Sequence, residues 1–384
     1  MKKKGFTLIE LLAVIVVLAI IALIATPIVM NTIKNAKKGA AERSTDNYIK
    51  GVELAISTSE INRKSIPDGE YSLDTEGNLI VTSLPDGKLE VEMNGNKPKS
   101  GIIVIKDGEV MTDSTMIIGE YIVYYDETTK RYTAVEIKKY NNGDIVYFNV
   151  TTGAKCTSSD YAETQGNIGV KEGCMKFYVF NDNGGVTLNL ILDHNTTATV
   201  AWNSSEISAI SADGPKKVLE QLKTDTDTWQ GTITPTNYTM DQTGQTSNAN
   251  YTIDYSGYKA RLITAQEITT ITGNTSWNEK TSNNVFYFDT NTTSTGSKCK
   301  SGNITGCQYG WLYDRTLTGC TTYGCLNNSD QTTYGYWTAS SCANTSQHAW
   351  YVSSRALISS DNVGANGAIR GVRPVIAVLR SKFL

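Results

Sequence analysis

The sequence predicts an α+β fold, and three features of the chain indicate it. A long apolar segment near the start has the length of a membrane-crossing helix. Short segments with alternating apolar residues follow it, separated by turn sequences such as Asn94-Gly95. Farther along, strand-like segments alternate with short helical patterns. We therefore expect one long helix, an antiparallel β head and a mixed second region.

The apolar segment runs from Phe6 to about Met30 and carries a single charge, Glu10. About 25 helical residues at 1.5 Å each span roughly 37 Å, which is enough to cross a bilayer. The lysines at positions 2–4 precede the segment and favour a cytoplasmic N-terminus, so the remaining chain is expected outside the membrane. No small-residue cleavage site follows it, so we expect the segment to remain on the mature protein.

The residues around Glu10 carry a specific resemblance. Gly5-Phe6-Thr7-Leu8-Ile9-Glu10 after a short basic leader resembles the class III signal of type IV prepilins and pseudopilins. The resemblance implies that residues 1–5 are a leader, that a prepilin peptidase/methyltransferase cuts between Gly5 and Phe6 and methylates Phe6, and that Glu10 recruits the next subunit by meeting its amino terminus. A buried ammonium and a buried carboxylate are tolerated only as a pair, which agrees with this role. The alternative is a plain signal anchor whose Glu10 reaches the membrane interface.

The helical pattern continues beyond the apolar segment. Tyr48, Val52, Ala55 and Ile56 form one apolar stripe at helical spacing, so we expect a helix over residues 6–60 that is amphipathic after about residue 30. Pro27 lies inside this helix, where a missing hydrogen bond is expected to kink or locally melt it.

Residues 61–143 are expected to form a pilin-type antiparallel head. The apolar period changes to two after the helix, and turn sequences separate the predicted strands. The predicted strands are Leu79–Val81, Leu89–Met93, Gly101–Ile105, Glu109–Met111, Tyr121–Tyr125 and Tyr132–Ile137.

Residues 144–384 are expected to form a second, mixed domain. A hairpin joins residues 175–180 to 186–192, a helical patch covers residues 216–223, and Thr264 with Glu267 predicts a capping box. The segments around Arg261, Trp337, Trp350 and Arg373 resemble the C-type-lectin-like fold, in the branch related to formylglycine-generating enzymes. The resemblance implies framework roles for Trp337, Trp350 and Arg373.

All seven cysteines follow position 150. A chain that places them outside the membrane can oxidise them, and short loops favour Cys156–Cys174, Cys299–Cys307 and Cys320–Cys325 as pairs. The odd number leaves one thiol, for which Cys342 is the candidate. A zinc site is the weaker alternative, because no second close pair with histidines accompanies Cys320 and Cys325.

Composition and motifs argue against several activities. The net charge of −3 indicates no polybasic face for nucleic acid. Nucleophile-elbow, P-loop, zinc-protease and dinucleotide motifs are absent from the sequence, and His194 and His348 stand alone. Asp182 and Asp361 lie in turn-like stretches without the alternation of a calcium loop. We therefore expect no cofactor, no metal and no enzymatic role.

The sequence therefore predicts a type IV pilin-like structural subunit with an adhesive second domain, and the bulk of that domain favours a minor or tip position. Its expected partners are the peptidase, other pilin subunits, the membrane and a surface glycan or protein. The expected location is a single membrane pass before assembly and the cell surface or pilus afterwards. A pseudopilin of a type II secretion or DNA-uptake machine is one alternative, and a membrane-anchored enzyme of the formylglycine-generating branch is the other.

Overall fold

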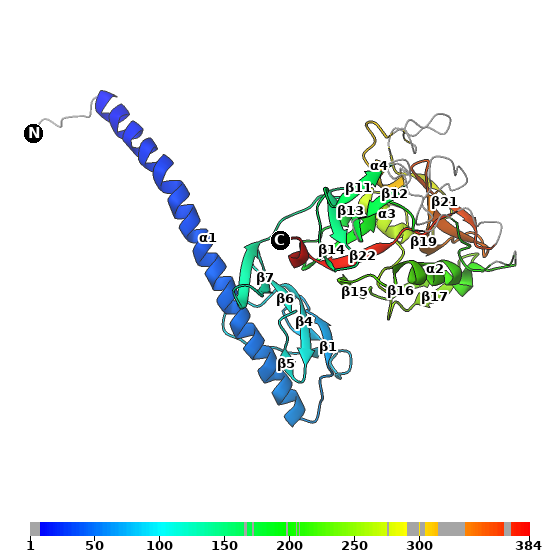
Figure 1. Cartoon of the computed structure of the whole chain (residues 1–384), viewed down its shortest axis with the longest axis horizontal. Helices are drawn as coiled ribbons and strands as arrows, with labels where there is room; N and C mark the ends of the chain where they lie inside the picture. Colours follow the sequence, from blue (N-terminus) through cyan, green and yellow to red (C-terminus); the bar gives the residue numbers. More distant parts are fainter. Residues whose placement is uncertain are drawn as a thin grey trace, which may run out of the picture. The chain divides into compact units, whose positions relative to one another are not determined.

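The computed structural model describes residues 8–164, 167–170, 173–196, 199–204, 206, 208–274, 276–289, 299, 304–313, 335–364 and 370–384. The chain divides into two compact units, Met1–Lys138 (unit 1) and Lys139–Leu384 (unit 2). Both units combine helices with antiparallel strands (Figure 1), so the predicted α+β class is confirmed.

Unit 1 consists of one long helix, α1 (Leu8–Ile61), and a sheet that packs against its second half. The helix continues through Pro27, so the predicted local melting is not observed. The sheet has the order β1-β4-β6-β7-β8 with β5 paired to β4, and β2 pairs with β3. The strands are β1 (Gly69–Ser72), β2 (Leu79–Ile80), β3 (Lys88–Leu89), β4 (Ser100–Lys106), β5 (Glu109–Val110), β6 (Thr115–Ile118), β7 (Tyr121–Asp126) and β8 (Arg131–Glu136).

The core of unit 1 lies between α1 and this sheet. Tyr48, Val52 and Ile56 are almost fully buried there, as the apolar stripe on the helix predicts. The predicted strand over residues 89–93 is wrong beyond Leu89. Val91 instead packs against the helix at Gly51, where a Cβ would come within 2.7 Å of the Glu92 carbonyl oxygen. This close approach takes residues 90–93 out of strand pairing.

Unit 2 contains a six-stranded sheet with the order β10-β9-β13-β14-β22-β15 and a four-stranded sheet with the order β18-β21-β20-β19. Two hairpins, β11-β12 and β16-β17, complete its strand pairs. The first strands are β9 (Ile145–Asn149), β10 (Ala154–Lys155), β11 (Tyr161–Thr164), β12 (Asn167–Val170), β13 (Cys174–Asn181), β14 (Thr187–Leu192) and β15 (Thr232–Ile233). The others are β16 (Tyr238–Asp241), β17 (Asn250–Ile253), β18 (Phe286–Tyr287), β19 (Gly335–Ser341), β20 (His348–Ser353), β21 (Leu357–Asn362) and β22 (Val375–Leu379).

The helices of unit 2 are α2 (Lys216–Thr226), α3 (Ala265–Ile271) and α4 (Gly310–Tyr313), with 3₁₀ turns η1 (Ser211–Asp213) and η3 (Arg380–Phe383). Thr264 caps α3 together with Glu267, and this is the predicted capping box. The two faces of the large sheet cover separate cores. Phe177 and Val179 of β13 belong to one core, whereas Tyr178 and Phe180 belong to the other.

Candidate functional site

The first half of α1 is an exposed apolar surface. The helix is long and apolar enough to cross a membrane, and the most apolar stretch of it is not buried at all in the structure. Large apolar side chains along this half are more than half exposed, for example Leu12, Leu23 and Ile28. A surface of this size is stable in water only when lipid or other protein covers it. This half of α1 is therefore the first candidate site.

Glu10 lies in the first turn of α1. The free N–H groups of that turn carry partial positive charge, so a carboxylate is favourable at this end of the helix. Gly5 and Phe6, the predicted cleavage and methylation residues, lie outside the described residues. In the sequence, Glu10 follows Phe6 by four residues.

Side chains on both partners fix the second half of α1 to the head. The Tyr48 hydroxyl donates to the Gly77 carbonyl oxygen at 2.8 Å, and the Tyr121 hydroxyl donates to the Lys34 carbonyl oxygen at 3.2 Å. Glu42 accepts the backbone N–H of Ala134 in β8 at 3.1 Å. Burial raises the pKa of Tyr48, with a further contribution from the charge of Asp74, so its hydroxyl keeps its proton and remains a donor.

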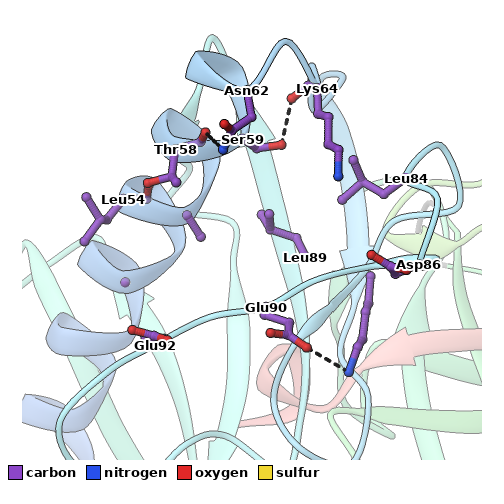
Figure 2. Close-up of a pocket in the computed structure, with 13 residues that line it drawn as sticks. Leu54, Thr58, Ser59, Asn62, Lys64, Leu84, Asp86, Leu89, Glu90 and Glu92 are labelled. Atoms are coloured by element: carbon purple, nitrogen blue, oxygen red, sulfur yellow. Dashed lines mark hydrogen bonds and ion pairs between the residues drawn. The ribbon is translucent and has the colours of Figure 1, made fainter.

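A groove of about 500 Å³ lies between the last turns of α1 and residues 84–92. Figure 2 shows Leu54, Thr58 and Asn62 on the last turns of the helix, and Leu84 and Leu89 on the segment that forms the other side of the groove. Charged side chains lie along the rim, where Lys88 pairs with Glu90 at 3.2 Å. The volume suits a small ligand or an inserted side chain. No local sequence pattern predicts this groove, because the residues of its two walls are about thirty positions apart.

Unit 2 contains two disulfides, Cys156–Cys174 and Cys299–Cys307, which are two of the pairs that short loops predict. The third predicted pair, Cys320–Cys325, lies outside the described residues. Cys342 has a free, buried thiol, as the odd cysteine count suggests. Burial raises the pKa of this thiol, so it is not an activated nucleophile.

The carboxylate of Asp289 approaches the sulfur atoms of Cys299 and Cys307, with all the potential ligand atoms within 4.8 Å of one another. The two cysteines are joined as a disulfide, so their sulfur atoms are not thiolates. Zinc binds the thiolate form of cysteine. The arrangement as it stands is therefore a disulfide beside a buried acid, and it does not fit a zinc site.

The remaining candidate residues of unit 2 lie in the interior. Trp337, Trp350 and Arg373 are buried, and the Arg373 guanidinium donates to the carbonyl oxygens of Leu192 at 2.6 Å and Leu312 at 2.7 Å. The same guanidinium also donates to the backbone carbonyl oxygens of Asp193 and Trp311. These contacts fit the framework roles that the sequence resemblance implies.

Both histidines, and the two aspartates that were considered as calcium ligands, have hydrogen-bond or ion-pair partners within the protein. His194 pairs through Nδ1 with Asp193, and His348 lies 3.4 Å from the Ser360 hydroxyl. Asp182 forms a buried ion pair with Arg380, and Asp361 pairs with Arg370 at 2.7 Å. Arginine occupies the place of a cation at both carboxylates. Asp182 lies in the loop after β13, as predicted, whereas Asp361 lies in strand β21 and pairs with Ala349 of β20, so its prediction as a turn residue is wrong.

Comparison with known proteins identifies one feature. A family described as the prokaryotic N-terminal methylation motif matches residues 1–26. This motif and the long apolar helix support a type IV pilin-like protein, processed by a prepilin peptidase and assembled with other pilin subunits. No curated protein and no solved structure matches the chain. The resemblance of unit 2 to the C-type-lectin-like fold therefore stays a prediction.

Proposed function

We propose that the chain is a minor or tip subunit of a type IV pilus-like surface filament, and that unit 2 is its binding domain. The observation that carries the proposal is the methylation motif at residues 1–26, which leads directly into an exposed apolar helix. The helix holds the subunit in the membrane before assembly, with its amino terminus in the cytoplasm, and holds it in the filament afterwards.

Glu10 is the proposed recruiting group. After cleavage, the Phe6 ammonium of one subunit and the Glu10 carboxylate of the next meet in apolar surroundings, where two opposite charges stabilise each other. Glu10 lies in the first turn of α1, within reach of the helix end. Mass spectrometry of the mature amino terminus tests the processing step, and we expect N-methylphenylalanine at Phe6. An intact Met1 in filament material would contradict it.

Substitution separates assembly from anchoring. We expect Glu10→Leu to leave membrane insertion intact and to reduce incorporation into filaments at least tenfold. Glu60→Leu, which removes an exposed carboxylate near the other end of α1, is the matched control and should assemble normally. Equal incorporation of both variants would show that the apolar helix is only an anchor.

The tip position rests on size. Unit 2 follows a complete helix-and-sheet unit, and a head enlarged in this way hinders close lateral packing of many copies. Gold labelling of unit 2 should mark filament ends, and labelling along the whole length would contradict the tip position. A pseudopilin of a secretion or DNA-uptake machine would carry the same motif. Loss of protein secretion or of DNA uptake on deletion of the chain, with filaments and adhesion retained, would favour that role.

A further inference from the structure

A lysine, an asparagine and two carboxylates converge in unit 1 beside the turn that precedes β2. Asn78 is 4% exposed, and the Lys97 ammonium lies 3.3 Å from its Oδ1. Asp74 and Glu76 accept from its Nδ2 at 3.1 Å and 3.4 Å. We propose that Lys97 and Asn78 react to form an intramolecular isopeptide bond.

The orientation of the amide suits this reaction. Asn78 Oδ1 faces two donors, the backbone N–H of Val91 at 3.3 Å and Lys97, whereas Nδ2 faces only carboxylates. The hydrogen-bond network therefore fixes which end of the amide is oxygen. Gly77 lets the lysine reach it, since a Cβ on Gly77 would lie 3.0 Å from the Lys97 Cβ, and Gly77 has a φ of +78°.

The step balances without an oxidant or a cofactor. The Lys97 ammonium gives one proton to water, and the neutral Nζ then attacks Cγ of Asn78. The Val91 N–H stabilises the negative charge that develops on Oδ1. The attacking Nζ then gives its second proton to the Asp74 carboxylate, the carbon–nitrogen bond of the amide breaks as Asp74 passes this proton to the departing nitrogen, and ammonia leaves. The product is an amide between Lys97 Nζ and residue 78.

Asp74 is suited to the role of base. Partial burial opposes its ionisation, but N–H groups of Asn78 and Glu76 donate to it and hold its pKa below the ordinary value. It is therefore a carboxylate near neutral pH, and its Oδ2 already contacts the nitrogen that must leave. One turnover in the lifetime of the protein is enough, so a weak base suffices.

The bond would restrain a specific part of unit 1. Residues 78–97 form the closed loop, and this loop carries Leu84 and Leu89 of the groove in Figure 2. Unit 1 has no cysteine, because the first cysteine of the chain is Cys156. A covalent link across these residues lowers the entropy of the unfolded chain, as a disulfide does in secreted domains.

Peptide mapping of the full-length purified protein tests the proposal. Trypsin should cut after Lys64, Lys88 and Lys99 but not after Lys97, which precedes Pro98. Without the bond, residues 65–88 and 89–99 appear as two peptides. With the bond, they appear as one branched peptide whose mass is lower than the sum of the two peptide masses by one ammonia, about 17 Da.

Matched variants assign the reaction. Lys97→Arg keeps the positive charge and the uncut bond before Pro98, so it should give only the two separate peptides and a lower melting temperature of unit 1. Lys99→Arg, an exposed change two residues away, should give the branched peptide as in the wild type. Asp74→Asn should slow its appearance at least tenfold. Only separate peptides from wild-type protein, even after prolonged incubation at neutral pH, would overturn the proposal. The proposed role in a filament does not depend on this result.

Discussion

The two units stabilise their β-rich folds in different ways. Unit 1 packs its large sheet and the β2-β3 pair against one helix around one core, and it has no cysteine. Unit 2 covers both faces of its large sheet, and it uses disulfides and buried arginines to join distant segments. A long helix supplies unit 1 with a continuous surface to pack against. In the part of unit 2 that the structure describes, the helices are short, and specific links join the segments instead.

This difference predicts that the two units unfold under different conditions. Unit 1 should respond to changes along α1, whereas unit 2 should respond to redox conditions and to the loss of single buried groups. Calorimetry of the full chain in detergent should show two transitions that can be assigned by substitution. The following changes test the contrast.

The largest effect is expected from Arg373→Met in unit 2. Arg373 is 3% exposed, and its removal takes away a donor from several buried carbonyl oxygens, including that of Leu192. We expect a loss of more than about 3 kcal/mol in the free energy of unfolding of unit 2. The control Arg355→Met changes an exposed arginine and should cost little. Equal losses would show that Arg373 has no framework role.

Reduction of the disulfides should give the next largest effect. Cys156–Cys174 joins residues 18 positions apart, and opening a loop of this size costs about 3 kcal/mol. A reducing agent should therefore lower the melting temperature of the transition that belongs to unit 2. The melting temperature of unit 1 should not change. A shift of both transitions would contradict the separation of the two units.

A smaller effect is expected from Tyr48→Phe in unit 1. The change leaves the Gly77 carbonyl oxygen without its buried donor, which should cost about 1 kcal/mol. Tyr71→Phe is the control, because its bond to the Pro67 carbonyl oxygen lies at the exposed surface. Thermal unfolding should shift for unit 1 only, and a shift of unit 2 would count against the assignment.

The smallest effect concerns pH and Glu279 of unit 2. Burial raises the pKa of this carboxyl above 4.5, although Ser340 and the Gln266 N–H donate to it. Its contribution to stability is complete below the ordinary pKa and is lost as pH rises through the raised value. Glu279→Gln cannot ionise, so its unfolding free energy should fall less than that of the wild type between pH 5 and pH 8, by about 1 kcal/mol or less. If the unfolding free energies of the wild type and of Glu279→Gln change with pH in parallel, Glu279 does not contribute to the pH dependence of stability.

Local patterns predicted much of the fold. The stripe of Tyr48, Val52 and Ile56 predicted the buried face of α1, and Thr264 with Glu267 predicted the start of α3. The strand β6 had no such signal. All four of its residues are buried, so the alternation that marks a strand with one exposed face is absent.

The candidate sites also differ in whether a local sequence pattern predicts them. The processing motif is contiguous, so the sequence alone indicated Glu10. The contact of Asn78 with Lys97 and those of Arg373 join residues that are 19 or more positions apart. No local spacing encodes such contacts, because they depend on how turns and strands meet in the folded chain.

The hydrogen bond that the Ala134 N–H donates to Glu42 affects more than the stability of the head. Strand β8 ends its sheet, and a bare strand end readily pairs with the same strand of another molecule. By lying along β8, the helix covers this edge and hinders its pairing with the same strand of a second copy.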